Sequence, residues 1–515
     1  MKRRFLAAAL SAALLLTLAA CGTWEEPADA MDDLANYYKE ENDAPVPTAI
    51  TDFTLPYSPG STVEPVNCSD GIQQTLGALL YEGLFQLDEH FLPQPVLADS
   101  VTYDPDTFTY FITLKDGIVF SDGSPISSWD VASTLRRALE SERYGERLRH
   151  VQSIDTAVGM VIIHLTEDIR HFTARLDIPI VQAGTEKKLV PTGSGPYVWV
   201  TEGSAAHLAR NENWWQDDSD SLLPRIELLP CKSADYAFYA FSSRDVQLMA
   251  CDLTSSANFP TAITGDYAQA DTPTLQYLGF NTFAGAFYDP ALRRALSTSL
   301  NRSSLISACL MGYGEAAQFP IHPASTIYPA ELEVSYTANA LDTALAQKGY
   351  SAREPMEATL VVNEENSFKV ALAREIARAL QSELLTLTVV TLPWEQFQEA
   401  LFLRNYDIYL GEVTLTADWD ATSLLSSGGA LNFGDFSDPV LDELLLAYRA
   451  ADDDTLALAA EKLCRQMQEN VPIAPLLFKE SSVLTTAGVV DGLSPTAADP
   501  FYHMSQWKVH LGQNR

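Results

Sequence analysis

The sequence has few cysteines and few basic side chains. Its 515 residues include six cysteines, and 33 Lys and Arg stand against 68 Asp and Glu, which gives a formal net charge of −35. This shortage of basic residues argues against a nucleic acid as partner. The cysteines lie far apart with no CxxC pair, so small buried thiols are expected rather than a disulfide framework. Only Cys231 and Cys251 are candidates for pairing.

The sequence also lacks the usual catalytic and metal-binding motifs. It contains no Gly-x-Ser-x-Gly elbow, no His-Glu-x-x-His helix and no phosphate-binding loop ending in Gly-Lys-Ser/Thr. Its eight histidines are scattered singly, and the spacing of His164 and His171 fits no metal-site template. We therefore expect a protein that is not an enzyme and holds no metal or cofactor. A surface hydrolase is the alternative, which turnover of a peptide or glycan by the purified protein would favour.

Long uncharged apolar runs are missing apart from residues 5–20. This run follows a basic segment at residues 2–4, which is the pattern of an export signal, and it is too short to span a membrane comfortably. It ends in Leu-Ala-Ala-Cys-Gly at residues 18–22, which resembles the lipobox of bacterial lipoproteins. We therefore expect residues 1–20 to be removed and Cys21 to carry the lipid that anchors the exported protein to the outer face of the cell membrane. An ordinary signal peptide with a chance cysteine is the alternative.

Acidic residues are concentrated directly after this signal. Eight of them lie between Glu25 and Asp43 against a single lysine, with prolines close by. Such a composition cannot bury enough apolar surface to fold, so residues 21–50 are expected to form a disordered acidic tether. The rest of the chain is long enough for two or three domains at the usual size of about 100 to 200 residues each.

Local patterns in the rest of the chain predict helices and strands in mixed order. Residues 107–114 alternate between two faces as a half-buried strand does. Ser127 and Asp130 have the spacing of a capping box, and the apolar stripe of a helix follows them. Asp289-Pro290 and Asp438-Pro439 each combine a capping aspartate with a proline suited to the first helical position. Each of these pairs is therefore expected to begin a helix.

Two β-branched runs flank a further helical stripe. The runs are Ala358–Asn363 and Thr386–Leu392, and Leu372, Ile376 and Leu380 recur at helical spacing between them. A strand, a helix and a second strand in this order predict a βαβ unit. The mature chain is therefore expected to be a mixed α/β protein with more than one lobe.

Seven short motifs follow one another between residues 80 and 302. They are Leu80–Phe85 (LYEGLF), Phe108–Gly117 (FTYFITLKDG), Phe120–Pro125 (FSDGSP), Gly193–Tyr197 (GSGPY), Arg210–Trp215 (RNENWW), Leu278–Asn281 (LGFN) and the stretch from Asp289 to Arg302. In this order they resemble the family 5 extracellular solute-binding proteins, the oligopeptide, dipeptide and nickel-binding group that serves ABC importers. Most of their glycines and aromatic residues suit the turns and cores of a scaffold.

The resemblance implies an α/β, periplasmic-binding-protein-like fold, a two-lobed type II clamp with an inserted subdomain. Residues 51–276 would form lobe I with the subdomain at about 71–190, residues 277–480 would form lobe II, and residues 481–515 would return to lobe I. It also implies capture of a small solute between the lobes and delivery to ABC permease subunits. We expect a monomer with a peptide as ligand. A sugar or another solute, and a receptor that reports its ligand to a sensor, are the alternatives.

The same resemblance points to ligand-binding residues. Residues 417–424 resemble the segment in which peptide-binding members place an aspartate against the α-amino group of the peptide, and Asp418 takes that position. Trp419 would add an aromatic wall, and Tyr57 is expected to face the cleft at the end of its strand. A structural reading of the segment stays open, in which Asp418 or Asp420 caps a short helix and Trp419 belongs to the core.

Overall fold

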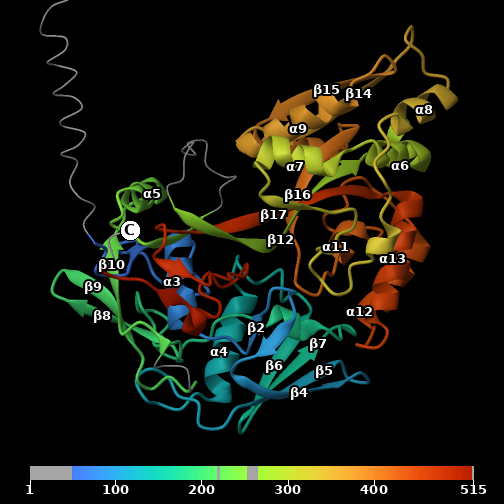
Figure 1. Cartoon of the computed structure of the whole chain (residues 1–515). Helices are drawn as coiled ribbons and strands as arrows, with labels where there is room; N and C mark the ends of the chain where they lie inside the picture. The colour runs from blue at the N-terminus through green and yellow to red at the C-terminus, as the bar shows by residue number, and fades with distance from the viewer. Residues whose placement is uncertain (1–48, 217–220, 252–264, 513–515) are drawn as a thin grey trace, which may run out of the picture. The chain divides into compact units, whose positions relative to one another are not determined.

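The computed structural model describes residues 49–216, 221–251 and 265–512 of the chain (Figure 1). Residues 52–511 form one compact unit. The expected signal peptide, Cys21 and nearly all of the expected tether lie outside the described residues. Within the described ranges, no helix is both long enough and apolar enough to cross a membrane.

One four-stranded sheet is assembled from segments that are far apart in the sequence. In spatial order its strands are β1 (Thr54–Tyr57), β10 (Arg225–Pro230), β9 (Ala205–Arg210) and β8 (Tyr197–Glu202), with α3 (Gly71–Leu80) packed on β1 and β8 and α5 (Ala234–Ser242) following β10. Strands β1 and β10 are parallel, and the other neighbours are antiparallel. Helix α3 begins after Asp70, whose side chain accepts hydrogen bonds from the N–H groups of Ile72 and Gln73.

Three of the family-like motifs meet next to β8 and β9. The Glu82 carboxylate accepts a hydrogen bond from Nε1 of Trp214 at 3.0 Å and another from Nε1 of Trp215 at 2.9 Å. The buried Asn211 donates from Nδ2 to the carbonyl oxygen of Gly195 at 2.8 Å. The three motifs therefore hold one another in place, which is the scaffold role that their composition predicts.

A second four-stranded sheet is antiparallel throughout. In spatial order its strands are β4 (Ala98–Asp104), β5 (Thr109–Leu114), β7 (Met160–Leu165) and β6 (Val151–Ala157), with α4 (Ser128–Leu139) packed on β6 and β7, and a hairpin of β2 (Phe85–Leu87) and β3 (Pro93–Pro95) precedes it in the chain. The strand expected over 107–114 is confirmed but begins at Thr109, because Phe108 has a left-handed backbone with φ of 52°. The capping box of Ser127 and Asp130 is confirmed.

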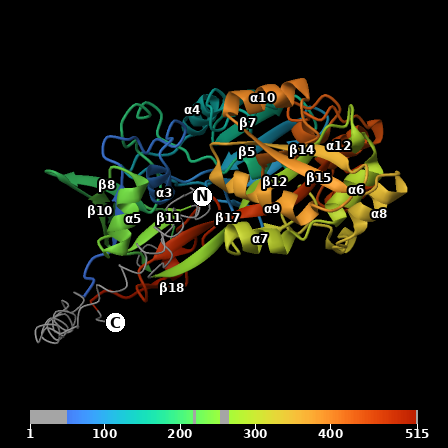
Figure 2. The same ribbon diagram turned by 90° about the horizontal axis from the view of Figure 1, so that it is seen from above.

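The third sheet has seven strands and contains the expected βαβ unit. In order these are β11 (Leu248–Cys251), β17 (Ile473–Thr485), β12 (Asp266–Phe280), β16 (Ile408–Thr414), β14 (Met356–Asn363) and β15 (Leu385–Leu392), with β13 (Gly314–Ala316) paired to β17. Strands β14 and β15 are parallel and joined by α9 (Ser367–Leu380), which confirms the unit. The next helix, α10 (Trp394–Leu403), leads back across the sheet to β16, and Figure 2 shows α9 and α10 on opposite sides of β14 and β15.

The remaining helices follow the capping signals of the sequence. They are α6 (Pro290–Thr298), α7 (Arg302–Leu310), α8 (Ala340–Gln347), α11 (Thr422–Leu425), α12 (Pro439–Arg449) and α13 (Leu456–Asn470). Asp289 and Asp438 are the N-caps of α6 and α12, as expected. The buried Arg293 on α6 donates from Nε to the Val471 carbonyl oxygen at 2.8 Å, where α13 ends. It thereby supplies a donor to carbonyl groups that have no partner inside their own helix.

Two long strands, β12 and β17, form an antiparallel ribbon that can be followed in Figure 1. Their pairing is irregular between Asp271 and Leu275, where the register shifts. The expected lobe boundaries at residues 276 and 480 both fall inside this ribbon, and these boundaries stay predictions. Two short strands near the C-terminus, β18 (Val490–Asp491) and β19 (Lys508–Val509), pair with each other.

Candidate functional site

A cavity of about 330 Å³ has Asp418 and Trp419, two of the residues expected to bind ligand, in its wall. The rest of the wall comes from segments that are distant in the sequence. These include His90 to Pro93, His171 with Thr173 and Ala174, Ser325 to Ile327, and Asp453 with Leu456 and Ala457. The cavity is therefore a product of the tertiary fold, and we take it as the candidate site.

A larger cavity of about 410 Å³ lies between residues 78–87, Trp214 and the segment around Asp499. Glu82, in its wall, already accepts hydrogen bonds from three neutral side chains. Asp499 accepts one from Nε2 of Gln86 at 2.7 Å, and burial raises the pKa of this aspartate to about 6. This cavity is walled by scaffold motifs, whereas the smaller one contains the segment expected to contact ligand.

Trp419 turns the chain between the two aspartates of the segment. Its backbone is left-handed, with φ of 56°, and its N–H donates to the carbonyl oxygen of Thr416 at 2.8 Å. Its side chain is only 2% exposed, packs edge-on against Phe91 with ring centres 4.9 Å apart, and donates from Nε1 to Oγ of Ser325 at 3.1 Å. Trp419 is therefore mostly a core residue, with a small part in the cavity wall.

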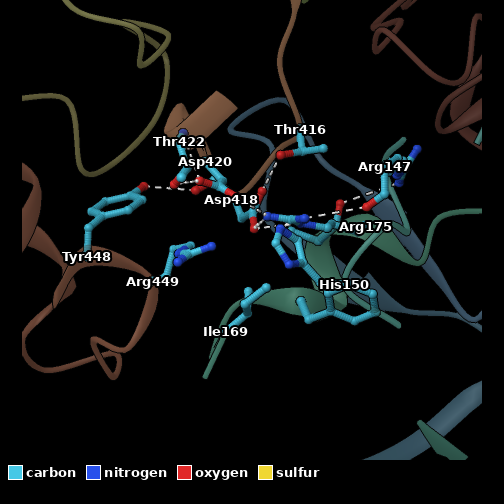
Figure 3. A network of polar contacts seen from close by, with 12 residues as sticks. Arg147, His150, Ile169, Arg175, Thr416, Asp418, Asp420, Thr422, Tyr448 and Arg449 are labelled. Atoms are coloured by element: carbon cyan, nitrogen blue, oxygen red, sulfur yellow. Dashed lines mark hydrogen bonds and ion pairs between the residues drawn. The ribbon is translucent and has the colours of Figure 1, made fainter. Parts of the chain in front are cut away.

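Asp418 and Asp420 both reach one guanidinium group, that of Arg175 (Figure 3). Nε of Arg175 lies 2.8 Å from Oδ2 of Asp418, and Nη2 lies 2.7 Å from the same oxygen and 3.0 Å from Oδ2 of Asp420. Arg175 is the last residue of a 3-10 helix, η1 (Phe172–Arg175), and is 1% exposed. The structure thus places two buried carboxylates around one buried cation.

The pKa shifts of Arg175 and Asp420 keep these two members of the triad charged. Burial by itself would lower the pKa of Arg175, but Asp418 and Asp420 outweigh burial and raise it. Burial would likewise raise the pKa of Asp420, but the charge of Arg175 and hydrogen bonds from Thr422 hold it well below its usual range. The bridge between Arg175 and Asp420 is therefore a true ion pair at neutral pH.

Further ion pairs surround this triad. Nη2 of Arg149 lies 3.5 Å from Oδ2 of Asp420, Arg147 pairs with Asp177, and Nη2 of Arg449 lies 2.6 Å from Oε2 of Glu167. Arg149 also pairs with Glu146 at 2.6 Å, so with the triad these pairs contain four arginines, at positions 147, 149, 175 and 449, and five acids, at positions 146, 167, 177, 418 and 420. We call these nine residues the charge cluster, and its formal net charge is −1.

The structural reading of residues 417–424, in which an aspartate supports the start of a short helix, fits Asp420 and not Asp418. Oδ1 of Asp420 accepts hydrogen bonds from the N–H of Thr422 at 3.0 Å and from its hydroxyl at 2.5 Å, so Asp420 supports the start of α11. Asp418 instead accepts a hydrogen bond from the Thr416 hydroxyl at 2.5 Å.

Tyr57 lies at the end of β1 with its ring edge-on to Trp199, 5.4 Å between centres, and does not line the Asp418 cavity. Its place in a ligand cleft stays a prediction.

Sequence reasoning missed Arg175. Its partners Asp418 and Asp420 are 243 and 245 residues away, and no local pattern links them. The one available signal is an arginine followed by Leu176 and, after Asp177, by Ile178, of which the two apolar residues are buried. A charge in such a context needs a partner, but the sequence does not say which one.

A separate group of carboxylates lies on the β12–β17 ribbon. Glu480 is directly opposite Asp271 in the register, and Glu315 on β13 is close enough to add its charge. Burial, then the charges of Asp271 and Glu315, raise the pKa of Glu480 to about 7. Like charges opposite each other on neighbouring strands are destabilising when both are ionised.

We expect the Glu480→Gln substitution to stabilise the protein at pH 8 more than at pH 5. Between the usual pKa of 4.5 and the folded value of about 7, the folded state binds more protons than the unfolded state, so stability falls as pH rises through this window. Because Glu480 is partly exposed, we expect a gain of only about 1 kcal/mol at pH 8. Urea unfolding at both pH values measures it. The exposed Glu357 on β14 provides the control, Glu357→Gln, and equal effects of the two substitutions would contradict the prediction.

Cysteines and potential metal ligands add no further site. Cys231 and Cys251 form no disulfide with each other. In the part of the chain that the structure describes, no three His, Cys, Asp or Glu side chains are grouped closely enough to hold a metal ion.

Comparison with protein-family models assigns the sequence to a family. The model for "bacterial extracellular solute-binding proteins, family 5 Middle" matches residues 93–434. The glutathione-binding protein GsiB of Shigella flexneri serotype 5b is 24% identical over 303 residues, which are 54% of this chain and 55% of that protein. GsiB of Escherichia coli K12 is 25% identical over 289 residues, or 51% and 54%. The chain thus spans about half the length of the curated relatives it matches.

Solved structures share the fold. MppA, a periplasmic murein tripeptide-binding protein in its unliganded open form, matches with a TM-score of 0.72 and 18% identity over 87% of this chain and 96% of that one. A nickel ABC transporter protein from Bacillus halodurans matches with a TM-score of 0.73 and 19% identity over 87% and 98%. The expected α/β fold of the two-lobed type II binding proteins is thereby confirmed. Since the family model covers well over half of the sequence, the chain belongs to the bacterial extracellular solute-binding proteins of family 5.

Proposed function

We propose that the protein is the substrate-binding component of an ABC importer and captures a small solute in the cavity beside Asp418. One observation carries the proposal: a buried carboxylate borders a cavity whose walls come from segments spread between His90 and Ala457. A concave site with mainly apolar walls and a few oriented polar groups is the usual form of a small-molecule site. Family membership supports the same class of function.

We propose a peptide as the ligand. Relatives named for binding glutathione and a murein tripeptide support this choice. The cavity volume of about 330 Å³ is near the lower end for ligand pockets, which favours a short peptide. In this proposal Asp418 receives the α-ammonium group, a charge-assisted contact that contributes about 1.5 to 3 kcal/mol, and Trp419 contacts the adjacent part of the ligand. Tyr57 would act at a more distant part of the cleft.

We also propose a setting for this function. Lipid on Cys21 would hold the protein, as a monomer, at the outer face of the cell membrane, where the acidic tether of residues 21–50 keeps its body near the permease. A binding protein of this kind does not require catalysis. A sugar or another solute as ligand, and a sensor rather than a permease as partner, are the alternatives.

The test is thermal unfolding of the purified protein with pools of di- to octapeptides and with a panel of sugars. A ligand at about a hundredfold excess over its Kd stabilises the native state by about 2.7 kcal/mol, so a bound peptide raises Tm clearly. We expect the Asp418→Asn substitution to remove most of this shift. Asp453→Asn is the matched control, because Asp453 also lines the cavity but its side chain is 99% exposed. A Tm shift with a sugar and with no peptide would exclude the peptide.

A further inference from the structure

The carboxylate of Asp418 is already occupied by partners within the protein. Its Oδ2 lies 2.8 Å from Nε and 2.7 Å from Nη2 of Arg175, and its Oδ1 accepts the Thr416 hydroxyl hydrogen bond at 2.5 Å. Asp418 borders the cavity, whereas Arg175 is 1% exposed and does not line it. A ligand in the cavity would therefore approach Asp418 while the guanidinium of Arg175 holds its carboxylate from within the protein, and Figure 3 shows Arg175 and Asp418 pointing toward each other.

The geometry of this arrangement constrains the ligand. Arg175, Asp418 and Asp420 are the buried part of the charge cluster, with side chains that are 1%, 4% and 2% exposed. Both oxygens of Asp418 are already occupied, so an ammonium group that simply joined them would share Oδ2 with the guanidinium and hold two cations close together away from water, which is costly. A ligand cation can form a strong bond to Asp418 only if Arg175 weakens its own bond to that residue.

Asp420 offers Arg175 an alternative partner. Its Oδ2 lies 3.0 Å from the same Nη2 that bridges to Asp418, and its pKa is held well below the usual range, so it stays ionised. The guanidinium is planar and carries several N–H donors, so small rotations can shift its hydrogen bonds from one carboxylate to the other. The Tyr448 hydroxyl, which donates to the Asp418 carbonyl oxygen at 2.9 Å, fixes the backbone on which this exchange would occur.

We infer that Arg175 is a specificity-determining residue that competes with the ligand's ammonium group for Asp418, and that Asp420 takes up Arg175 when such a ligand binds. The inference rests on the proposed capture of peptides. It has a direct consequence for selection: the wild-type protein gains less from a free α-amino group than an uncontested contact with Asp418 would supply, because part of that gain is offset by the weakened Arg175 bond. The preference for a free peptide over its N-acetylated form is then smaller than the Asp418 contact alone predicts.

Two substitutions should move this preference in opposite directions. The quantity to measure is the Kd of an N-acetylated peptide divided by the Kd of the same peptide with a free amino group, by titration calorimetry. Arg175→Gln removes the competitor, so the ratio should rise about tenfold, as the gain of one charge-assisted hydrogen bond predicts. Asp420→Asn leaves Arg175 with Asp418 alone, so the ratio should fall about tenfold or reach a value below one.

The control is Arg170→Gln. Arg170 belongs to the same region and pairs with Asp168 at 3.4 Å and with Asp452 at 3.9 Å, and among the described residues no hydrogen bond or ion pair joins it to Asp418 or Asp420. Arg170→Gln removes the same charge as Arg175→Gln and should leave the ratio unchanged. Because each ratio compares two peptides on one variant, a general loss of affinity in that variant affects both Kd values equally and cancels.

The outcomes separate the two proposals. Peptide binding with a ratio that is the same in the wild type, Arg175→Gln and Asp420→Asn would overturn the competition while the peptide function stands. No binding of either peptide form by any variant would overturn both. If Arg175→Gln does not fold, Asp420→Asn decides: a lower ratio supports the competition, and an equal or higher ratio overturns it.

Discussion

Replacing Gly195 by alanine is expected to destabilise the protein by at least about 3 kcal/mol. A Cβ atom at this position would lie 2.6 Å from the carbonyl carbon of Leu80, 2.7 Å from the Leu79 oxygen and 2.8 Å from the Tyr81 nitrogen. All three are backbone atoms, so no side chain can rotate away. The N–H of Gly195 also donates to the Leu80 carbonyl oxygen at 3.0 Å, and the clash would break this hydrogen bond.

Denaturant unfolding of the Gly195→Ala variant measures the loss. The matched control is Gly71→Ala at the start of α3, where a Cβ atom meets nothing within 4 Å. Alanine favours helix more than glycine does, so the control should be neutral or slightly stabilising. An unchanged free energy of unfolding for Gly195→Ala would mean that the GSGPY turn does not pack on residues 79–81 as described.

Replacing Arg175 by glutamine is expected to lower the free energy of unfolding by about 3 to 5 kcal/mol at pH 7. The substitution leaves Asp418 and Asp420 buried together without their shared cation, and glutamine can satisfy their hydrogen bonds only in part. Removing one partner of a buried ion pair is much more costly than losing a surface pair, because the remaining charge stays away from water. Urea unfolding at pH 7 measures the effect.

The pH dependence distinguishes this loss from simple loss of packing. Without Arg175, both aspartates would have raised pKa values in the folded state, so the folded variant would bind more protons than the unfolded chain. Its deficit relative to the wild type should therefore shrink as the pH falls from 7 toward 4. Arg378→Gln is the control, since the exposed Arg378 pairs with Glu375 on the surface, and it should cause no measurable loss. A deficit that is constant with pH would contradict the buried-charge explanation.

Local sequence determined where many elements begin. Ser127, Asp289 and Asp438 each cap a helix at the predicted position, because a capping side chain bonds to N–H groups only two or three residues away. The βαβ unit from β14 to β15 was predictable for the same reason: strand and helix periodicity are properties of short windows. Phe108 shows the limit, since its left-handed backbone shortens a strand that alternation alone would extend.

The order of the family-like motifs was sufficient to predict the family and the fold class, and it also located Asp418 and Trp419. It did not show what these residues contact. Trp419 is almost fully buried against Phe91, and Tyr57 packs against Trp199 away from the Asp418 cavity. A motif reports which position a residue occupies in a related chain, whereas burial depends on side chains that other segments contribute.

Only the tertiary structure decided how the site is charged. The sequence by itself determined an acidic α/β chain of the family 5 kind with an aspartate at position 418, and it predicts export. It contained no information that the cation for this aspartate is Arg175, 243 residues earlier. The energy of an ion pair depends on distance in space and on removal from water, and neither quantity is a function of separation along the chain. The nine residues of the charge cluster therefore come together only when the chain has folded.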